Sequence, residues 1–302
     1  MIFTKLHRRD IWHCTVVIIC TIILAFATSC SLSKNLSAPA NQNHLTIHII
    51  DVGNADAILI KNGDRSMLID AGENGDGDDV VAFLRRKGVQ SLDYAIATHP
   101  DADHIGGMDI VINEIPVAKF IMSIMPTSIT PTTKTYIDLL KALDQNNLKI
   151  TKAVPGKSYM LGNSRFTILG PVTEFNSTND MSVICRLEFG KQRFLFMGDA
   201  EKRAENSLLE SNIDLKADFI KLGHHGSDTS SQKEFLKAVN PRYAVICCGA
   251  GNRYGHPHVK TLALLKELNI SYYRSDLNGN ITVISDDNKI TVNTDSHYKT
   301  EK

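Results

Sequence analysis

The stretch Thr98–Gly107, with the sequence Thr-His-Pro-Asp-Ala-Asp-His-Ile-Gly-Gly, places four potential metal ligands within six residues. It directly follows Leu92–Ala97, a largely apolar run that predicts a short buried strand. A loop at the end of a strand can aim alternate side chains into one cavity, and imidazole and carboxylate groups suit zinc, manganese or iron. Without cations these groups would repel one another and lose solvation. The spacing therefore predicts a metal site, with the potential ligands His99, Asp101, Asp103 and His104.

The pattern His-x-Asp-x-Asp-His-x-Gly-Gly, from His99 to Gly107, resembles the first metal-binding motif of the metallo-β-lactamase superfamily. The usual motif has a histidine where this chain has Asp101. This variant is typical of the extracellular hydrolase domain of ComEC-type competence proteins and their free-standing relatives, and it also resembles the motif of phosphorylcholine esterases. The resemblance implies an α/β fold, the four-layer αββα sandwich of the metallo-β-lactamase type. In that fold two mixed sheets lie face to face, with helices outside and metals at one sheet edge.

Three later stretches resemble further motifs of the same family, in the family's order. Residues 179–199 contain Asn-Asp-Met-Ser, a predicted hairpin of two strands, and Gly-Asp at the end. Residues 219–227 predict a strand followed by His-His-Gly-Ser. Residues 249–257 match the family's Gly-x-x-Asn-x-Tyr-Gly-His-Pro. The resemblance covers roughly residues 45–294.

Two stretches before the first motif also resemble the family. Asp51–Ala57 corresponds to an opening Asp-Val-Gly-Gln-Gly-Asp/Ser-Ala, with Asn54 in place of the glutamine and Ala55 in place of the second glycine. Asp70, in Asp-Ala-Gly, corresponds to the Asp-x-Gly that ends the third strand near the metals. The resemblance implies that Asp70 hydrogen-bonds a ligand histidine and fixes its tautomer; the alternative is that it caps its own turn. Asp51 is likewise expected to lie behind the ligands.

The resemblance implies two divalent cations, zinc or manganese, that share one aspartate. The first cation would be held by His99, Asp101 and Asp199. The second would be held by Asp103, His104, Asp199 and His225. Asn179 or Asp180 lies where other members place a third histidine, and the sequence leaves open whether either side chain reaches a metal.

Catalytic roles are expected, by the same resemblance, for Asp103, His224 and His256. His224 would lie behind its neighbour or contact the leaving group, and the sequence alone does not decide which of the paired histidines is the ligand. His256 would stand at the mouth of the site and either bind a phosphoryl oxygen or act as a general acid. Phosphate contacts are expected from Ser227, Asn252 and Arg253.

Residues 1–29 resemble a signal peptide of the bacterial lipoprotein type. Basic residues beginning with Lys5 precede the mostly apolar run Ile11–Phe26, and small residues lead to Cys30. The resemblance predicts cleavage before Cys30, lipidation of its thiol, and anchoring outside the cytoplasmic membrane. An uncleaved single-span anchor is the alternative. Residues 30–44 would be the lipidated cysteine and a polar tether, residues 45–294 the hydrolase domain, and residues 295–302 a polar tail.

Composition limits the range of functions. The 302-residue chain is 43% hydrophobic, which is enough for a substantial core, and its formal net charge is zero. A dedicated nucleic-acid binder usually carries a basic excess, so contact with a polyanion would have to be local or mediated by metal. Cys185, Cys247 and Cys248 are predicted to be small core residues, because neighbours on a strand face opposite ways and cannot form a disulfide framework.

The expected reaction is metal-assisted hydrolysis of a phosphodiester, with DNA as the first candidate substrate. The second candidate is an envelope phosphoesterase that acts on phosphorylcholine or teichoic-acid-type diesters. The third is a surface accessory lipoprotein that binds metal without turnover. A β-lactamase is disfavoured because Asp101 replaces a histidine and the later histidine motifs differ.

Overall fold

The computed structural model describes residues 44–295. The predicted signal 1–29, the lipidation site Cys30, the tether up to residue 43 and the tail from residue 296 lie outside the described residues. These domain boundaries therefore stay predictions. Within residues 44–295, no helix is long and apolar enough to cross a membrane.

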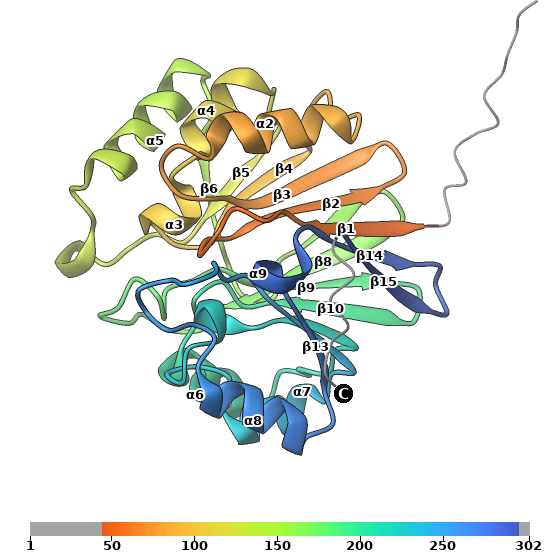
Figure 1. The fold of residues 1–302 in the computed structure, drawn as a ribbon. Coiled ribbons are helices and arrows are strands. Elements are labelled where there is room, and N and C mark those ends of the chain that lie inside the picture. The colour runs from red at the N-terminus through yellow and green to blue at the C-terminus, as the bar shows by residue number, and fades with distance from the viewer. Residues whose placement is uncertain (1–43, 296–302) are drawn as a thin grey trace, which may run out of the picture. The chain divides into compact units, whose positions relative to one another are not determined.

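Two mixed sheets form the centre of the fold (Figure 1). The eight-stranded sheet has the order β15 (Ile290–Thr294), β14 (Ile281–Ser285), β1 (Leu45–Ile49), β2 (Ala57–Asn62), β3 (Arg65–Ala71), β4 (Tyr94–Ala97), β5 (Phe120–Met122), β6 (Ile150–Lys152). The seven-stranded sheet has the order β13 (Ser271–Arg274), β12 (Tyr243–Ile246), β11 (Phe219–Lys221), β10 (Gln192–Phe196), β9 (Ile184–Phe189), β8 (Ser164–Gly170), β7 (Ser158–Leu161). Neighbouring strands are parallel from β3 to β6 and from β10 to β13, and the other neighbours are antiparallel.

Helices cover the outer face of each sheet (Figure 1). The first sheet is covered by α2 (Gly77–Arg86), α4 (Met108–Glu114) and α5 (Lys134–Gln145). The second sheet is covered by α6 (Lys202–Glu210), α7 (Lys233–Val239) and α8 (Val259–Glu267). Single-turn segments complete the described chain: α3 (Ala102–Ile105), η1 (Thr127–Ile129), η2 (Gly223–Gly226) and α9 (Ser275–Asn278).

Three apolar clusters hold these four layers together. One lies between the sheets, with Phe166, Phe194 and Phe219 fully buried, and each of the other two lies between a sheet and its helices. Burial of this kind stabilises by roughly 25 cal/mol per Å² of apolar surface, so the alternating apolar residues of the strands account for the layering. The expected four-layer αββα sandwich is confirmed.

The three described cysteines are free and buried, as predicted. Cys185 and Cys247 point between the sheets, whereas Cys248 belongs to the cluster under the helices. Adjacent residues of one strand thus face opposite ways.

The sequence of residues 105–114 predicts one helix, and this prediction is wrong in one respect, because the structure breaks the segment between α3 and α4 at Gly106 and Gly107. A Cβ on Gly106 would lie 2.1 Å from the backbone nitrogen of Asn74, and a Cβ on Gly107 would lie 2.4 Å from the carbonyl oxygen of Ala71. The two glycines therefore let the turn after β3 press against the metal-binding loop.

Glu205 on α6 is a buried acid, 1% exposed. Its carboxylate accepts hydrogen bonds from the backbone N–H groups of Ser231 and Gln232, which precede α7. Burial raises the pKa of Glu205 from 4.5 to about 7, and the nearby Asp180 adds to the rise. The folded protein therefore holds a proton that the unfolded chain has already lost at neutral pH.

We expect this group to make stability fall with rising pH. The contribution is fully present below pH 4.5 and is lost as the pH rises through about 7. The unfolding free energy of wild type relative to Glu205→Gln should therefore fall by about 2 kcal/mol between about pH 5 and about pH 8. Urea denaturation of both proteins at the two pH values measures this. A difference that does not change with pH would contradict the assignment.

Candidate metal centre

The candidate metal centre lies where the carboxyl ends of parallel strands from both sheets meet. Thr98 and His99 follow β4, Asp199 follows β10, and His225 follows β11. This edge is where α/β sheets commonly bind ligands. The loops here are tied together by backbone hydrogen bonds, since Asp56 N–H donates to the carbonyl of Asp103 at 3.0 Å.

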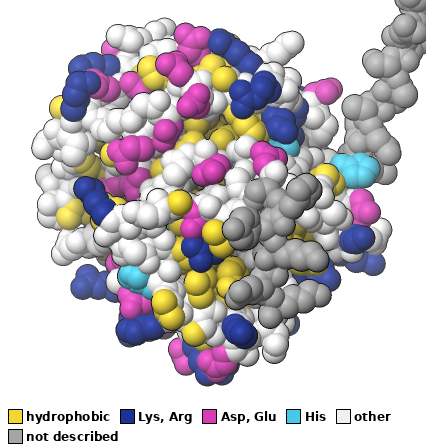
Figure 2. All heavy atoms as spheres, viewed as in Figure 1, with side chains coloured by type: hydrophobic (Ala, Val, Ile, Leu, Met, Phe, Trp, Pro, Cys, Tyr) yellow, Lys and Arg dark blue, Asp and Glu magenta, His cyan; other side chains and the backbone are white. Residues whose placement is uncertain are grey.

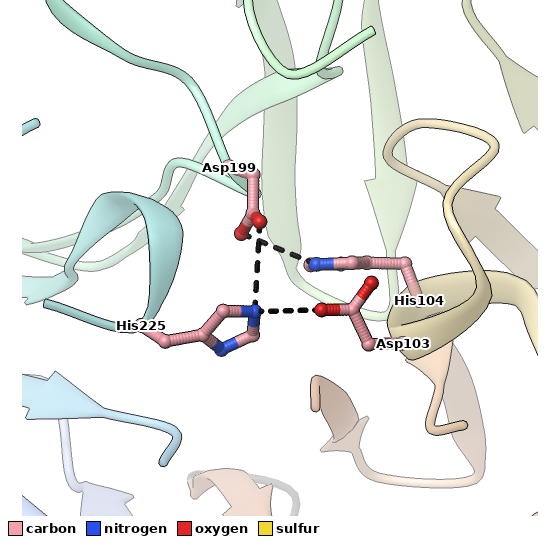
Figure 3. Close-up of side chains that lie close together, drawn as sticks. All are labelled: Asp103, His104, Asp199 and His225. Carbon is pink, nitrogen blue, oxygen red and sulfur yellow. Dashed lines mark ion pairs between the residues drawn. The ribbon is translucent and has the colours of Figure 1, made fainter. Parts of the chain in front are cut away.

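Four side chains converge closely (Figure 3). The Nε2 atom of His104 lies 3.2 Å from Oδ1 of Asp199, and the Nε2 atom of His225 lies 3.5 Å from Oδ2 of the same aspartate. His225 Nε2 is also 3.3 Å from Oδ2 of Asp103. One potential ligand atom from each of the four residues lies within 4.8 Å of the others. This set matches the one that the sequence assigned to the second cation.

Two further histidines approach the Oδ2 atom of Asp199 that His225 also approaches. The Nε2 atom of His99 lies 4.0 Å from Oδ2 of Asp199 and 3.7 Å from Oδ2 of Asp101. Nε2 of His224 lies 3.8 Å from the same Asp199 oxygen. Asp101 accepts a hydrogen bond from the hydroxyl of Thr178 at 3.4 Å. Asp199 is therefore placed to be shared, as the resemblance implies.

Several of these atoms are buried and have no hydrogen-bond partner in the described chain. They are Nε2 of His99, His104 and His225, together with Oδ1 of Asp199. A buried polar atom left unpaired costs roughly 1–3 kcal/mol, so a cluster of them that all face one point requires an explanation. Imidazole nitrogen and carboxylate oxygen are ligands for divalent cations, and the donor set therefore fits bound metal.

The electrostatics at this point are those of tightly paired opposite charges. Burial by itself would lower the pKa of His104, but the carboxylates of Asp199 and Asp70 outweigh it and raise that pKa well above its ordinary value. Burial likewise opposes the rise at His225, where Asp199 and Asp103 bring the pKa to about 9. For His99 burial dominates and lowers the pKa. Bound cations would take the place of the protons that these imidazoles otherwise hold.

Asp70 lies behind the ligands, where the resemblance places it. Its Oδ2 accepts a hydrogen bond from Nδ1 of His104 at 2.8 Å and another from the hydroxyl of Thr98 at 2.7 Å. Oδ1 accepts from the Thr98 backbone N–H at 2.8 Å. With its Nδ1 proton held by Asp70, His104 presents Nε2 to the centre.

Asp56 and Lys221, for which the sequence predicted no role, form a fully buried ion pair behind the centre. Lys221 also donates to the carbonyl of Gly198 at 3.1 Å, which fixes the turn before Asp199. Burial would lower the pKa of Lys221, but Asp56 and Asp199 outweigh it and raise that pKa. Asp56 Oδ1 lies 3.6 Å from Nδ1 of His225. Both residues lie inside the family-like motifs described above. The signal in the sequence that could have identified them is a charged side chain between apolar neighbours.

Ser182 is a further supporting residue that the sequence analysis missed. Its hydroxyl accepts a hydrogen bond from the backbone N–H of Asp199 at 3.0 Å. Gly198 has a φ of +53°, and a Cβ there would lie 3.0 Å from the Cβ and Oγ of Ser182. The family-like Ser and Gly-Asp therefore form one unit that orients Asp199.

Two predicted roles near the metals are corrected. Asp51 is exposed, and its carboxylate accepts a hydrogen bond from Gly53 in its own turn at 3.3 Å, so Asp56 and not Asp51 lies behind the ligands. The doubtful ligand Asp180 is also turned away. Its Oδ1 accepts from the backbone N–H groups of Glu201 and Ala204, so it caps the start of α6.

Two predicted phosphate contacts are corrected for a similar reason. Ser227 is buried, and its hydroxyl is bonded to the hydroxyl of Thr229 at 2.9 Å. The carboxamide of Asn252 bonds the backbone of its own loop: Nδ2 donates to the carbonyl of Gly249, and Oδ1 accepts from the N–H of His256. Neither side chain is free to bind a ligand. Arg253 is exposed and lines the cleft above the centre.

His224 and His225 both have positive φ angles, +48° and +52°. Such angles are uncommon outside glycine, and they turn the two imidazoles into the site from one short segment. Nδ1 of His224 bonds Oε1 of Glu201 at 2.8 Å, so its Nε2 faces Asp199. Burial, followed by the neighbouring imidazoles, lowers the pKa of His256 to about 4, and its ring lies 5.2 Å from that of His224.

The centre opens into a cleft of about 920 Å³. Asp101 and Asp103 line the cleft next to the metal centre and are called its floor, and Arg253 and Tyr254 belong to one wall. Among its described lining residues, Arg253 is the only basic one and Tyr254 the only aromatic one, whereas Glu73, Asp76 and the two floor aspartates are acidic. Figure 2 shows acidic side chains over the part of the molecule that carries α2 and α3, with lysine and arginine side chains among them.

Comparison with known proteins gives relatives for most of the described chain. ComE operon protein 3 of Bacillus subtilis (strain 168) is 33% identical over 203 residues, which are 67% of this chain and 26% of that protein. Competence protein ComA of Neisseria gonorrhoeae is 29% identical over 241 residues, which are 79% of this chain and 32% of that protein. The chain therefore spans about a quarter to a third of the length of these two relatives.

The fold has counterparts among solved structures. The metallo-β-lactamase fold protein YhfI from Bacillus subtilis covers 80% of this chain and 100% of its own, with a TM-score of 0.51 at 12% identity. The family model of the metallo-beta-lactamase superfamily matches residues 50–156 and 177–250. The chain therefore belongs to the metallo-β-lactamase superfamily, and its relatives include a competence protein.

Proposed function

We propose that the chain is a phosphodiesterase with two divalent cations and that it cleaves DNA outside the cytoplasm. The observation that carries this proposal is the double convergence on Asp199. The Nε2 atom of His104 approaches Oδ1 of Asp199, those of His225 and His99 approach Oδ2, and none of the three nitrogens has a hydrogen-bond partner among the described residues. Such a shared carboxylate supports two cations. Three aspartates among the proposed ligands make manganese as suitable as zinc.

Each residue of the proposed site has a chemical task. Two cations held there would lower the pKa of a water molecule and stabilise charge that develops on the phosphoryl oxygens. Asp103 lies 3.3 Å from His225 and at the cleft floor, where a carboxylate can orient an attacking water. His256 has a lowered pKa and is neutral at pH 7, so it suits hydrogen bonding to a phosphoryl oxygen better than acid catalysis.

The shape of the cleft supports an extended substrate. Its volume is about 920 Å³, and it has no aromatic cage among the described residues, because Tyr254 is the only aromatic side chain that lines it. Recognition of a quaternary ammonium group usually requires such a cage. Asp101 and Asp103 remain exposed to the cleft, which disfavours a purely accessory role.

One observation favours a second candidate function. Glu73 and Asp76 extend the acidic lining away from the metal ligands. A negative wall attracts a cationic group such as choline and repels a polyanion unless cations are bound. An envelope phosphoesterase for phosphorylcholine or teichoic-acid-type diesters is therefore the alternative.

The proposed location is the outer side of the cytoplasmic membrane. It rests on the sequence pattern of residues 1–30, with Cys30 as the lipid attachment site. A DNA substrate is suggested by the competence protein among the relatives. Because the chain spans only part of those proteins, the proposal concerns hydrolysis and not transport.

We expect Asp199→Ala to lose bound metal and turnover together, because the variant removes the carboxylate that the surrounding histidines share. The rate of single-stranded DNA cleavage should fall by roughly 10³-fold or more. Asp51→Asn is the matched control, because the Asp51 carboxylate bonds only its own turn and the variant should keep both properties. Metal content by mass spectrometry and DNA cleavage by gel electrophoresis measure the two effects. Wild-type activity in purified Asp199→Ala would rule out the shared-ligand role.

The substrate can be tested by giving the purified full chain, with Mn²⁺ or Zn²⁺ added, three compounds side by side. We expect cleavage of single-stranded DNA and of bis-p-nitrophenyl phosphate, and slower hydrolysis of p-nitrophenylphosphorylcholine, because the cleft is open and lacks an aromatic cage. Activity confined to the two small diesters would contradict the DNA proposal and favour the envelope phosphoesterase.

A further inference from the structure

The loop 249–257 forms one wall of the cleft, and its own side chains hold it rigid. Asn252 bonds the backbone four times: Nδ2 donates to the carbonyls of Gly249 and His256, and Oδ1 accepts from the N–H groups of Tyr254 and His256. Gly255, with a φ of +73°, allows the tight return to His256. The side chains of Arg253 and Tyr254 are therefore presented from a fixed backbone.

Tyr254 and Arg253 make a layered pair on this wall. The Tyr254 ring stacks on His256, with ring centroids 5.6 Å apart and an interplanar angle of 20°. The Arg253 guanidinium lies 4.8 Å from the Tyr254 ring centroid, and its Nη2 donates to the tyrosine hydroxyl at 2.6 Å. Tyr254 is nevertheless 52% exposed. A large aromatic side chain thus stands open at the mouth of the site, in contact with a residue of the proposed machinery.

The chemistry of the pair selects for an anionic ligand with flat groups. The Arg253 guanidinium already makes the cation–π contact that the Tyr254 ring offers, and its positive charge repels a second cation. The pair therefore disfavours a quaternary ammonium group. A guanidinium binds phosphate well, and both aromatic rings and guanidinium planes stack with nucleobases. Stacking of this kind contributes without reading sequence, because every base has a π-face.

We propose that Arg253 and Tyr254 form a nucleotide-binding platform beside the scissile phosphate, in which the exposed Arg253 guanidinium leaves the Tyr254 ring to contact a phosphate and a base takes its place on that ring. This inference rests on the proposed phosphodiesterase function and makes it specific for single-stranded nucleic acid. The platform shares its cleft with Asp101 and Asp103, so a chain bound at the metal centre runs over it. The acidic residues Glu73 and Asp76 line the same cleft and leave Arg253 as its one described positive charge.

The test compares a ten-nucleotide thymidine oligomer with an abasic oligomer that has the same number of phosphates. The full chain is assayed with Mn²⁺, and the readout is the ratio of kcat/KM for the two oligomers. Wild type should prefer the thymidine oligomer by roughly 10-fold or more. Tyr254→Leu should bring this ratio close to one, whereas Tyr254→Phe, which keeps the ring, should retain the preference.

Arg253→Gln separates the phosphate contact from stacking. It should lower kcat/KM for both oligomers by a similar factor and weaken the salt dependence of cleavage, because one phosphate contact is lost. A wild-type ratio near one, or an equal loss on both oligomers in Tyr254→Leu, would overturn the stacking role. Failure of wild type to cleave either oligomer while it still hydrolyses bis-p-nitrophenyl phosphate would instead overturn the DNA substrate, and the platform with it.

Discussion

One buried carboxylate organises the site. Asp199 is 3% exposed at its side chain, and its oxygens lie within 4.0 Å of a nitrogen atom of four imidazoles, which belong to His99, His104, His224 and His225. Such an arrangement is stable only if positive charge lies between these groups, because buried carboxylates and unpaired nitrogens lose the solvation of water. Protons can supply that charge on some imidazoles, and divalent cations can supply it for all of them. The fold brings the four histidines together from both sheets.

The surrounding layers hold this arrangement in place. Asp56 precedes β2 in one sheet and Lys221 ends β11 in the other, so their buried ion pair joins the sheets directly behind the centre. A buried pair of this kind is costly to break, because removal of one partner leaves an uncompensated charge. Within the first sheet, Asp70 of β3 holds His104 and Thr98 in place through hydrogen bonds. The ligands are thus oriented by neighbours that themselves have fixed partners, which is how metal sites keep their geometry.

The charge pattern around the centre links the two candidate functions. The charged residues that line the described cleft are mostly acidic. Arg253 is the one basic lining residue, and it lies beside Tyr254, the one aromatic lining residue. Bound cations would reverse the sign of the floor and leave Glu73 and Asp76 as a negative margin. The DNA proposal therefore depends on local positive charge at the metals and at Arg253, in agreement with a chain whose formal net charge is zero.

The metal motif could be predicted from the sequence, because ligand types at short fixed spacing are a local property. The family and the fold class followed from the resemblance of this motif and the later ones to the metallo-β-lactamase superfamily. Asp103 and His104 are neighbours in the chain, and both point to the centre, as the motif implies. The partners across the sheets could not be predicted in this way. Asp51 and Asp56 stand in the same motif, yet only the second faces the ligands, because the turn between them decides which side chain points inward.

The same distinction applies to the other corrections. Asp180 and Asn252 have side chains that could act as ligands, but their oxygens accept hydrogen bonds from nearby backbone N–H groups. These hydrogen bonds exist only in the folded loops and could not be predicted from the sequence. The sequence by itself determined which chemical groups are present and in what order they occur. The tertiary structure alone decided which of them meet, because their positions depend on the register of both sheets and on the positive φ angles of His224, His225 and Gly198.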